Sequence, residues 1–97
     1  MTDFVRINHV FKTDKKLGPI EILRAIKLAI ASEFEAIQIY QQIMESCDDG
    51  RIINVLREIT DDEKKHAGGL YRLLEILSPT DAEKYAEGAE ETVENYR

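Results

Sequence analysis

In two long segments of this chain, a set of mainly apolar residues, which we call a stripe, recurs at every third or fourth position. That spacing brings the side chains onto one face of an α-helix. In residues 20–46 the stripe consists of Leu23, Ile26, Ile30, Glu33, Ile37, Tyr40 and Met44. In residues 51–77 it consists of Leu56, Ile59, Glu63, His66, Leu70, Leu73 and Leu77. The polar residues 47–50 between the segments predict a tight turn, and therefore an antiparallel helical hairpin.

Two short proline-containing segments mark the ends of the hairpin and separate it from the rest of the chain. Residues 1–18 show no sustained period and predict an extended, basic N-terminal arm, set apart from a single domain over residues 19–97. Gly18-Pro19 opens the hairpin and Ser78-Pro79 closes it. Residues 80–83 match a capping box that would open a third, acidic helix over residues 81–96. Because no β-type alternation occurs, the expected fold is all-α: a long antiparallel two-helix hairpin plus a short C-terminal helix.

Length and charge exclude several classes of protein. The 97 residues allow one small domain and too few helices for a four-helix bundle, so self-association is expected. A net charge of −6 argues against nucleic acid as a partner. No apolar run approaches the roughly 20 residues of a membrane span. The first 16 residues contain no apolar signal-peptide region, so a cytoplasmic location is expected. The single Cys47 excludes an internal disulfide and a cysteine-rich zinc site.

Three polar residues interrupt the apolar stripes and point to a metal site. Glu63 and His66 form a Glu-x-x-His pair, which places both side chains on one helix face about a turn apart. Glu33 lies 15 residues before Asp48 in the turn, and Glu63 lies 15 residues after it. Because both helices rise by about 1.5 Å per residue, the two carboxylates are expected at the same level. Two carboxylates and one imidazole suit iron or manganese.

The chain carries this set of ligands only once. Di-iron carboxylate bundles use a Glu from each of two helices and a Glu-x-x-His pair from each of the other two. Two copies of Glu33, Glu63 and His66 would supply that full set and would also close a four-helix bundle. The sequence therefore predicts a di-metal site shared between the two chains of a homodimer.

Each of these residues also has a simpler interpretation. Glu63 and His66 could form a buried or interfacial hydrogen-bonded pair without metal. Glu33 could be an interhelical salt-bridge partner of Lys64 or Lys65.

Two further residues remain open between a functional and a structural role. Tyr40 lies two turns beyond Glu33 on the same face, where it would be either part of the core or a hydrogen-bond donor to a ligand carboxylate. Glu35 lies off the stripe, as either a solvated surface charge or part of an outer metal-gathering site.

Two stretches resemble the encapsulated ferritins, a branch of the ferritin/rubrerythrin superfamily. They are residues 31–40, ASEFEAIQIY, and residues 62–67, DEKKHA, within a similarity that covers residues 20–95. The resemblance implies a two-helix subunit whose dimer forms a four-helix ferroxidase centre, with the dimers assembled into a decameric ring. It also implies oxidation of Fe²⁺ to Fe³⁺ inside an encapsulin nanocompartment in which the mineral accumulates.

The resemblance assigns roles to the same residues. It implies that Glu33, Glu63 and His66 are iron ligands, that Tyr40 supports a ligand, and that Glu35 belongs to an outer iron-gathering site. Ser32 stands where some relatives have a further carboxylate. Two other functions stay open: a rubrerythrin-like di-iron peroxidase, although the Cys₄ rubredoxin module is absent from this sequence, and a non-enzymatic helical dimerisation or adaptor module.

Overall fold

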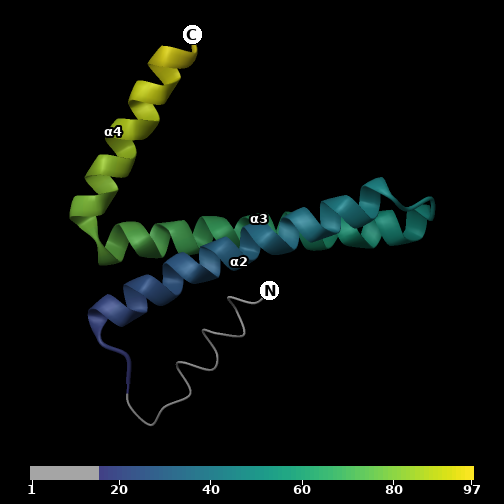
Figure 1. Ribbon diagram of the computed structural model, residues 1–97, viewed down its shortest axis with the longest axis horizontal. Coiled ribbons are helices and arrows are strands. Elements are labelled where there is room, and N and C mark those ends of the chain that lie inside the picture. The colour runs from purple at the N-terminus through teal and green to yellow at the C-terminus, as the bar shows by residue number, and fades with distance from the viewer. Residues whose placement is uncertain (1–15) are drawn as a thin grey trace.

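The structure is a computed structural model that describes residues 16–97. It contains three helices, α2 (Pro19–Glu45), α3 (Gly50–Leu77) and α4 (Pro79–Tyr96), and no strand in the described part of the chain (Figure 1). The predicted all-α hairpin with a C-terminal helix is confirmed. Within residues 16–97 no helix is both long and apolar enough to cross a membrane. Most of the predicted N-terminal arm lies outside the described residues, and its last residues, 16–18, have no regular secondary structure.

Helix α2 begins where the sequence places Gly18-Pro19. Proline suits the first helical position because its fixed φ is already helical and its missing N–H has no intrahelical partner there. The Glu21 carboxylate accepts a hydrogen bond of 3.2 Å from the backbone N–H of Gly18, which closes the first turn. The helix ends at Glu45, just before the polar turn.

Helix α3 begins after a side-chain cap at Asp49. The Asp49 carboxylate accepts a hydrogen bond of 2.9 Å from the backbone N–H of Arg51. The Arg51 guanidinium donates two more, at 3.2 Å and 3.1 Å. These hydrogen bonds, the side-chain ones most strongly, lower the pKa of Asp49 below its ordinary value of 3.8. The polar turn therefore also supplies the start signal for the second helix of the hairpin.

Helix α4 begins earlier than the capping box predicted. Ser78 is the residue before the helix, Pro79 is its first residue, and no side chain caps this end. The prediction was wrong because a proline with helical φ starts the helix by itself, which leaves Thr80 already inside the first turn.

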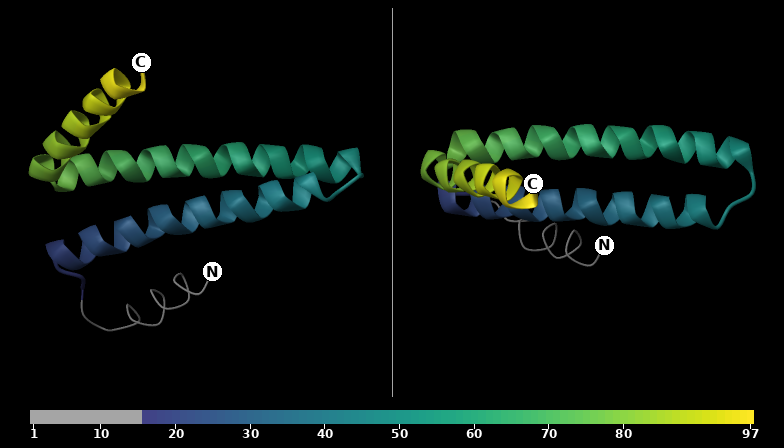
Figure 2. Two further views of the ribbon diagram at one scale, coloured as in Figure 1. Left: turned by 45° about the horizontal axis from the view of Figure 1, so that its top comes forward. Right: turned by 90° about the horizontal axis from the view of Figure 1, so that it is seen from above.

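Helices α2 and α3 lie side by side and antiparallel along a common seam (Figures 1 and 2). All seven stripe residues of α2 are buried or half-buried, as predicted. The prediction for the α3 side of the seam holds only in part: Leu56, Ile59, Glu63 and Leu70 are half-buried as predicted, whereas His66, Leu73 and Leu77 are exposed. The buried or half-buried residues of α3 are Ile53, Leu56, Ile59, Thr60, Glu63, Ala67, Leu70 and Leu74.

The prediction for α3 failed in part because two of its three most buried residues are small or polar. Thr60 is 3% exposed and Ala67 is 5% exposed, whereas the larger Leu73 is 43% exposed. Small side chains let two helices approach closely, which gives them buried positions that an apolar pattern does not reveal. The buried Thr60 hydroxyl is satisfied because it donates a hydrogen bond of 2.7 Å to the Leu56 carbonyl.

A second set of apolar side chains is left exposed along one side of the hairpin. All but one lie directly before a residue of the seam, and the last, Leu77, lies one turn beyond Leu73 on the same helix face. Because the helices are antiparallel, these positions fall on the same side of the pair. We call this set the open face; it consists of Ile22, Ile39, Ile43, Ile52, Val55, Leu73 and Leu77. Since only Ile30, Ala36, Ile37, Ala67 and Leu74 form the buried apolar core of the described residues, one chain holds half of a core.

The Asp49 cap gives a test of this fold. Replacing Asp49 by alanine is expected to lower the midpoint of thermal unfolding by a few degrees, because the first N–H groups of α3 lose their acceptor. This decrease in the unfolding midpoint should be present at neutral pH. It should become smaller as the pH falls below 3.8 and should disappear once the pH is below the lowered pKa of Asp49. Asp48→Ala in the same turn is the matched control, and an equal loss in both variants would contradict the cap.

Candidate metal centre

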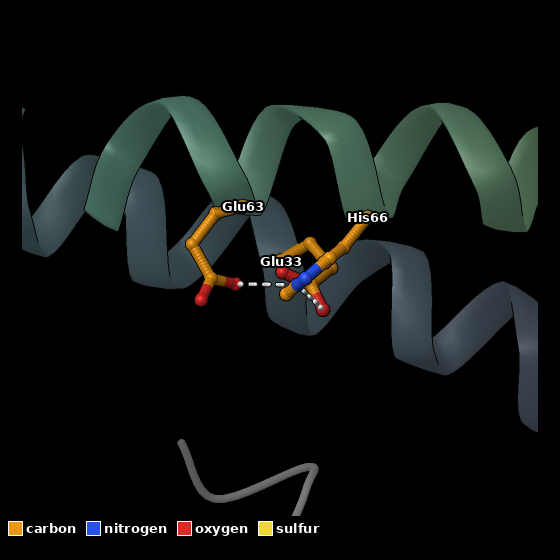
Figure 3. A group of neighbouring side chains, drawn as sticks. All are labelled: Glu33, Glu63 and His66. Carbon is orange, nitrogen blue, oxygen red and sulfur yellow. Dashed lines mark ion pairs between the residues drawn. The ribbon is translucent and has the colours of Figure 1, made fainter. Parts of the chain in front are cut away.

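The hairpin brings Glu33 of α2 together with Glu63 and His66 of α3. Figure 3 shows the three side chains extending from the two helices toward one another. The His66 Nδ1 atom lies 3.7 Å from Oε1 of Glu33 and 3.9 Å from Oε2 of Glu63. One potential ligand atom from each residue lies within 4.8 Å of the other two. The predicted convergence of these three residues at one level of the hairpin is therefore observed.

Within the described part of one chain, neither of the simpler interpretations of this cluster is seen. Distances of 3.7 Å and 3.9 Å are longer than a hydrogen bond, so His66 is not locked onto either carboxylate. The predicted alternative partners of Glu33 are not used: Lys65 lies 3.9 Å from Asp62, and neither Lys65 nor Lys64 forms an ion pair with Glu33. The three side chains are therefore close, with no hydrogen bond between them, and His66 forms ion pairs with the two carboxylates only if it is protonated.

One carboxylate oxygen of the cluster has no partner. The Oε2 atom of Glu33 is buried, and within the described part of the chain no hydrogen bond reaches it. A buried polar atom without a hydrogen bond costs about 1–3 kcal/mol, and a charged one costs more. A cation between Glu33, Glu63 and His66 would offset that cost.

The donor set fits a hard or borderline metal ion. Nitrogen and oxygen ligands lie about 2.0–2.2 Å from a bound ion, so two ligands of one ion are at most about 4.4 Å apart. The two measured separations of 3.7 Å and 3.9 Å fall inside that limit, and the 4.8 Å bound on the whole set needs side-chain shifts of a few tenths of an ångström. Carboxylates with one imidazole suit iron or manganese. The thiol of Cys47 is in the turn, where it donates to the Asp49 carbonyl.

The cluster is incomplete within one chain. The side chains of Glu33 and Glu63 are 20% and 21% exposed, but that of His66 is 58% exposed. The sequence placed His66 on the core-facing stripe, and this was wrong for the single chain: His66 directly precedes the buried Ala67 and so lies on the side of the open face. Three donors do not fill the coordination sphere of an iron ion, and residues 16–97 add no further His, Cys, Asp or Glu to this group.

Tyr40 and Glu35 are not part of the observed cluster. Tyr40 is half-buried on the α2 stripe, and within residues 16–97 its hydroxyl makes no hydrogen bond to the three residues. Glu35 is half-buried and contributes no atom to the group. Ser32 donates a hydrogen bond of 3.1 Å to the Leu28 carbonyl of its own helix. The roles predicted for Tyr40 and Glu35 stay predictions.

The open face was missed in the sequence, although its signal is there. Every position directly before the α2 stripe carries an apolar or small residue. These positions are Ile22, Ala25, Ala29, Ser32, Ala36, Ile39 and Ile43. Two stripes about 100° apart on one helix indicate a helix with neighbours on two sides, which is the arrangement in a four-helix bundle.

Comparisons with known proteins agree with this geometry. The family described as Rubrerythrin matches residues 24–96. The chain is 31% identical over 83 residues to an encapsulin nanocompartment cargo protein, EncC, of Myxococcus xanthus, covering 86% of this chain and 61% of that protein. It is also 31% identical over 81 residues to a ferritin-like–encapsulin shell fusion protein of Pyrococcus furiosus, covering 84% of this chain and 24% of that protein.

A solved structure is also similar over most of its length. The crystal structure of the encapsulated ferritin domain from Pyrococcus furiosus superposes with a TM-score of 0.82 at 29% identity. The match covers 89% of this chain and 88% of that one. By contrast, the chain spans about three fifths of the Myxococcus protein and about a quarter of the Pyrococcus fusion protein.

Metal binding to the cluster gives a test that does not depend on activity. Anaerobic Fe²⁺ at about 100 times its dissociation constant is expected to stabilise the wild-type chain by about 2.7 kcal/mol, seen as a higher unfolding midpoint. Glu33→Gln should lose this shift because the amide is a poorer ligand. Asp62→Asn, which removes a nearby exposed carboxylate outside the cluster, should keep it. An unchanged shift in Glu33→Gln would remove Glu33 from the metal site.

Proposed function

We propose that this chain, which belongs to the rubrerythrin family, oxidises Fe²⁺ to Fe³⁺ at a di-iron centre formed between two copies of itself. The resemblance of its sequence to the ferritin/rubrerythrin superfamily is confirmed. The observation that carries the proposal is the half-set of ligands, Glu33, Glu63 and His66, at the exposed edge of a half-built core.

A second copy would complete both the core and the ligand set. Two open faces packed together would bury apolar side chains that are 38% to 56% exposed in one chain. Full burial of an Ile, Leu or Val side chain is worth about 1.5–3 kcal/mol, so this face provides a strong drive to dimerise. The twofold axis would bring together two copies of Glu33, Glu63 and His66, which is the set used by di-iron carboxylate bundles. This arrangement explains why His66 lies at the open face.

The ligands suit iron oxidation in particular. Bound Fe²⁺ supplies one electron per ion to an oxidant, either O₂ or peroxide. The four carboxylates of two chains balance the charge of two Fe²⁺ ions, and hard anionic oxygen ligands favour the more highly charged Fe³⁺ product. His66 binds a metal only in its neutral form, so protons compete with iron for the site and acid should weaken binding.

Three further features of the chain would help it to gather and bind iron in this proposal. The Tyr40 hydroxyl would donate a hydrogen bond to a ligand carboxylate once the dimer forms, and so hold it in position. Glu35 would belong to an outer iron-gathering site. The net charge of −6 would raise the local concentration of Fe²⁺ around the molecule. Manganese is the other metal that these ligands would accept.

We place the active unit in residues 19–97 and its site of action in an encapsulin compartment within the cytoplasm. This location is supported by the names of the two relatives, a nanocompartment cargo protein and a fusion with a shell protein. The dimers would assemble further into a ring, decameric as the resemblance implies, packaged by or joined to an encapsulin shell protein.

The ligands can be tested by Fe²⁺ oxidation. Glu33→Ala and His66→Ala are each expected to lower the initial rate of ferric formation at least a hundredfold, because each removes two ligands from the shared centre. The measurement is the rise of ferric absorbance after Fe²⁺ is added in air. The wild-type dimer should hold about one iron per chain. Asp62→Ala, outside the cluster, is the matched control and should oxidise Fe²⁺ at the wild-type rate.

The same assay separates the rival functions. If both ligand variants keep the wild-type rate, the ferroxidase assignment is wrong. A rate that is large only with hydrogen peroxide would indicate the peroxidase, and a metal-free chain that still dimerises would indicate the adaptor module.

Tyr40→Phe tests the proposed support of the ligand. Removing the hydroxyl while keeping the ring is expected to lower the oxidation rate about tenfold, with the iron content unchanged within a factor of two. Phe34→Leu is the control for a change of an aromatic side chain, because Phe34 is exposed and lies outside the α2 stripe. A wild-type rate in Tyr40→Phe would show that the tyrosine only fills space in the core.

A further inference from the structure

An apolar groove opens at the elbow where α4 leaves the hairpin; we call it the elbow groove. Ile30 of α2 and Leu74 of α3, both buried, lie at its base. Tyr71 of α3 and Tyr85 of α4 line its sides and are 46% and 50% exposed. Its volume is about 310 Å³ on the α4 side and about 330 Å³ on the α2 side. A concave apolar site of this size can take up the side chains of a partner segment.

The α4 edge of the elbow groove is acidic. Ala82 and Ala89 line the groove, and Glu83 and Glu90 directly follow them, so both carboxylates lie about 100° around the helix from the groove, on the same side. Neither carboxylate forms an ion pair within residues 16–97. On the opposite side of the groove the α2 residue is Lys27, which also has no ion pair in the described part of the chain. The groove therefore favours an apolar segment that carries cations on its α4 side.

The predicted N-terminal arm of the same chain has this composition. Its residues 1–15 lie outside the described part of the chain, but their sequence is rich in apolar side chains: Phe4, Val5, Ile7, Val10 and Phe11. Four basic residues of the arm, Arg6, Lys12, Lys15 and Lys16, outnumber the two acidic ones. Helix α4 has the opposite balance, with six acidic residues and one lysine. The two ends of the chain are therefore complementary in charge.

The point of attachment puts the arm within reach of the elbow groove. Because the hairpin is antiparallel, α2 begins at the same end from which α4 leaves (Figures 1 and 2). Ile30 lies 11 residues after Pro19, which is about 16 Å along α2. Phe11 lies 8 residues before Pro19, and a segment of that length spans at most about 27 Å. Phe11 can therefore enter the groove, and the short tether gives it a millimolar effective concentration there.

We propose that residues 4–15 of the N-terminal arm dock into the elbow groove of their own chain. The ring of Phe11 packs between Tyr71 and Tyr85, and the lysines of the arm face Glu83 and Glu90. Lys27 repels these lysines and so keeps them on the α4 side of the groove.

The docked arm joins α4 to the hairpin. Only Ser78 links α4 to α3, no residue of α4 is buried in the described chain, and an isolated helix of this length is marginal in water. None of the residues that line the elbow groove belongs to the open face or to the cluster of Glu33, Glu63 and His66. The contact therefore does not depend on the proposed function.

A single tryptophan in the full-length chain tests this contact, because the sequence contains none. In Phe11→Trp the indole should be shielded from acrylamide quenching of its fluorescence. Adding Glu83→Lys and Glu90→Lys is expected to raise the quenching constant about threefold, because lysines then face lysines. Adding Lys12→Glu and Lys15→Glu to that variant should restore the shielding, since the charges are then exchanged.

The matched control is Glu58→Lys with Glu91→Lys, which makes the same change of charge at two exposed positions that do not line the groove. In the Phe11→Trp background it should leave the indole shielded. Equal quenching in the α4 variant and this control, or an indole that is fully accessible in Phe11→Trp alone, would overturn the contact.

Hydrogen exchange gives a second measurement in the chain without tryptophan. The amides of α4 should exchange faster in Lys12→Glu with Lys15→Glu than in the wild type, and equal rates would also contradict the docked arm. Co-expression of that variant with the tryptophan-carrying α4 variant separates the same chain from a second copy. If the indole becomes shielded in the mixture, the arm docks on another chain and the proposed contact is wrong.

The outcomes are distinguishable from those of the proposed function. All of these variants should oxidise Fe²⁺ at the wild-type rate, because their ligands and open faces are intact. If the indole is shielded as expected but the wild type does not oxidise Fe²⁺, the arm contact stands and the ferroxidase assignment fails.

Discussion

The register of the antiparallel seam between α2 and α3 is the constraint on which the rest of the structure depends. Small residues of α3, Thr60 and Ala67, set how closely the helices approach, and the Asp49 cap fixes where α3 begins. These contacts put Glu33 level with Glu63 and His66. A shift of the seam by one turn, about 5.4 Å, would separate the three ligand atoms beyond the reach of one ion.

The same seam leaves the apolar core of a single chain incomplete. It buries few apolar residues and exposes the open face, with His66 beside it and a buried Glu33 oxygen that has no partner. If the cluster binds a metal as proposed, incomplete packing and incomplete ligation occur at one place. Formation of the proposed dimer would complete both the packing and the ligand set, because the contact that buries the open face also brings in the second set of ligands. Assembly and iron chemistry would then be thermodynamically linked.

Helix α4 differs from α2 and α3 because it contributes no buried residue to the core of the described chain. One linking residue separates α4 from α3. An open groove of about 310 Å³ remains at this elbow, between Tyr71 and Leu74 of α3 and Tyr85 of α4.

The sequence by itself determined the helical hairpin, the turn and the level at which Glu33, Glu63 and His66 meet, because helix period and rise are local properties that spacing alone specifies. It predicted the α2 side of the seam correctly through Ile30 and Ile37. It determined the α3 side only in part, because Thr60 and Ala67 are buried and Leu73 is not. Burial depends on how closely two helices approach, and a small residue allows that approach without adding to an apolar pattern. Only the tertiary structure decided that His66 lies at an exposed edge, since this depends on contacts between segments distant in sequence.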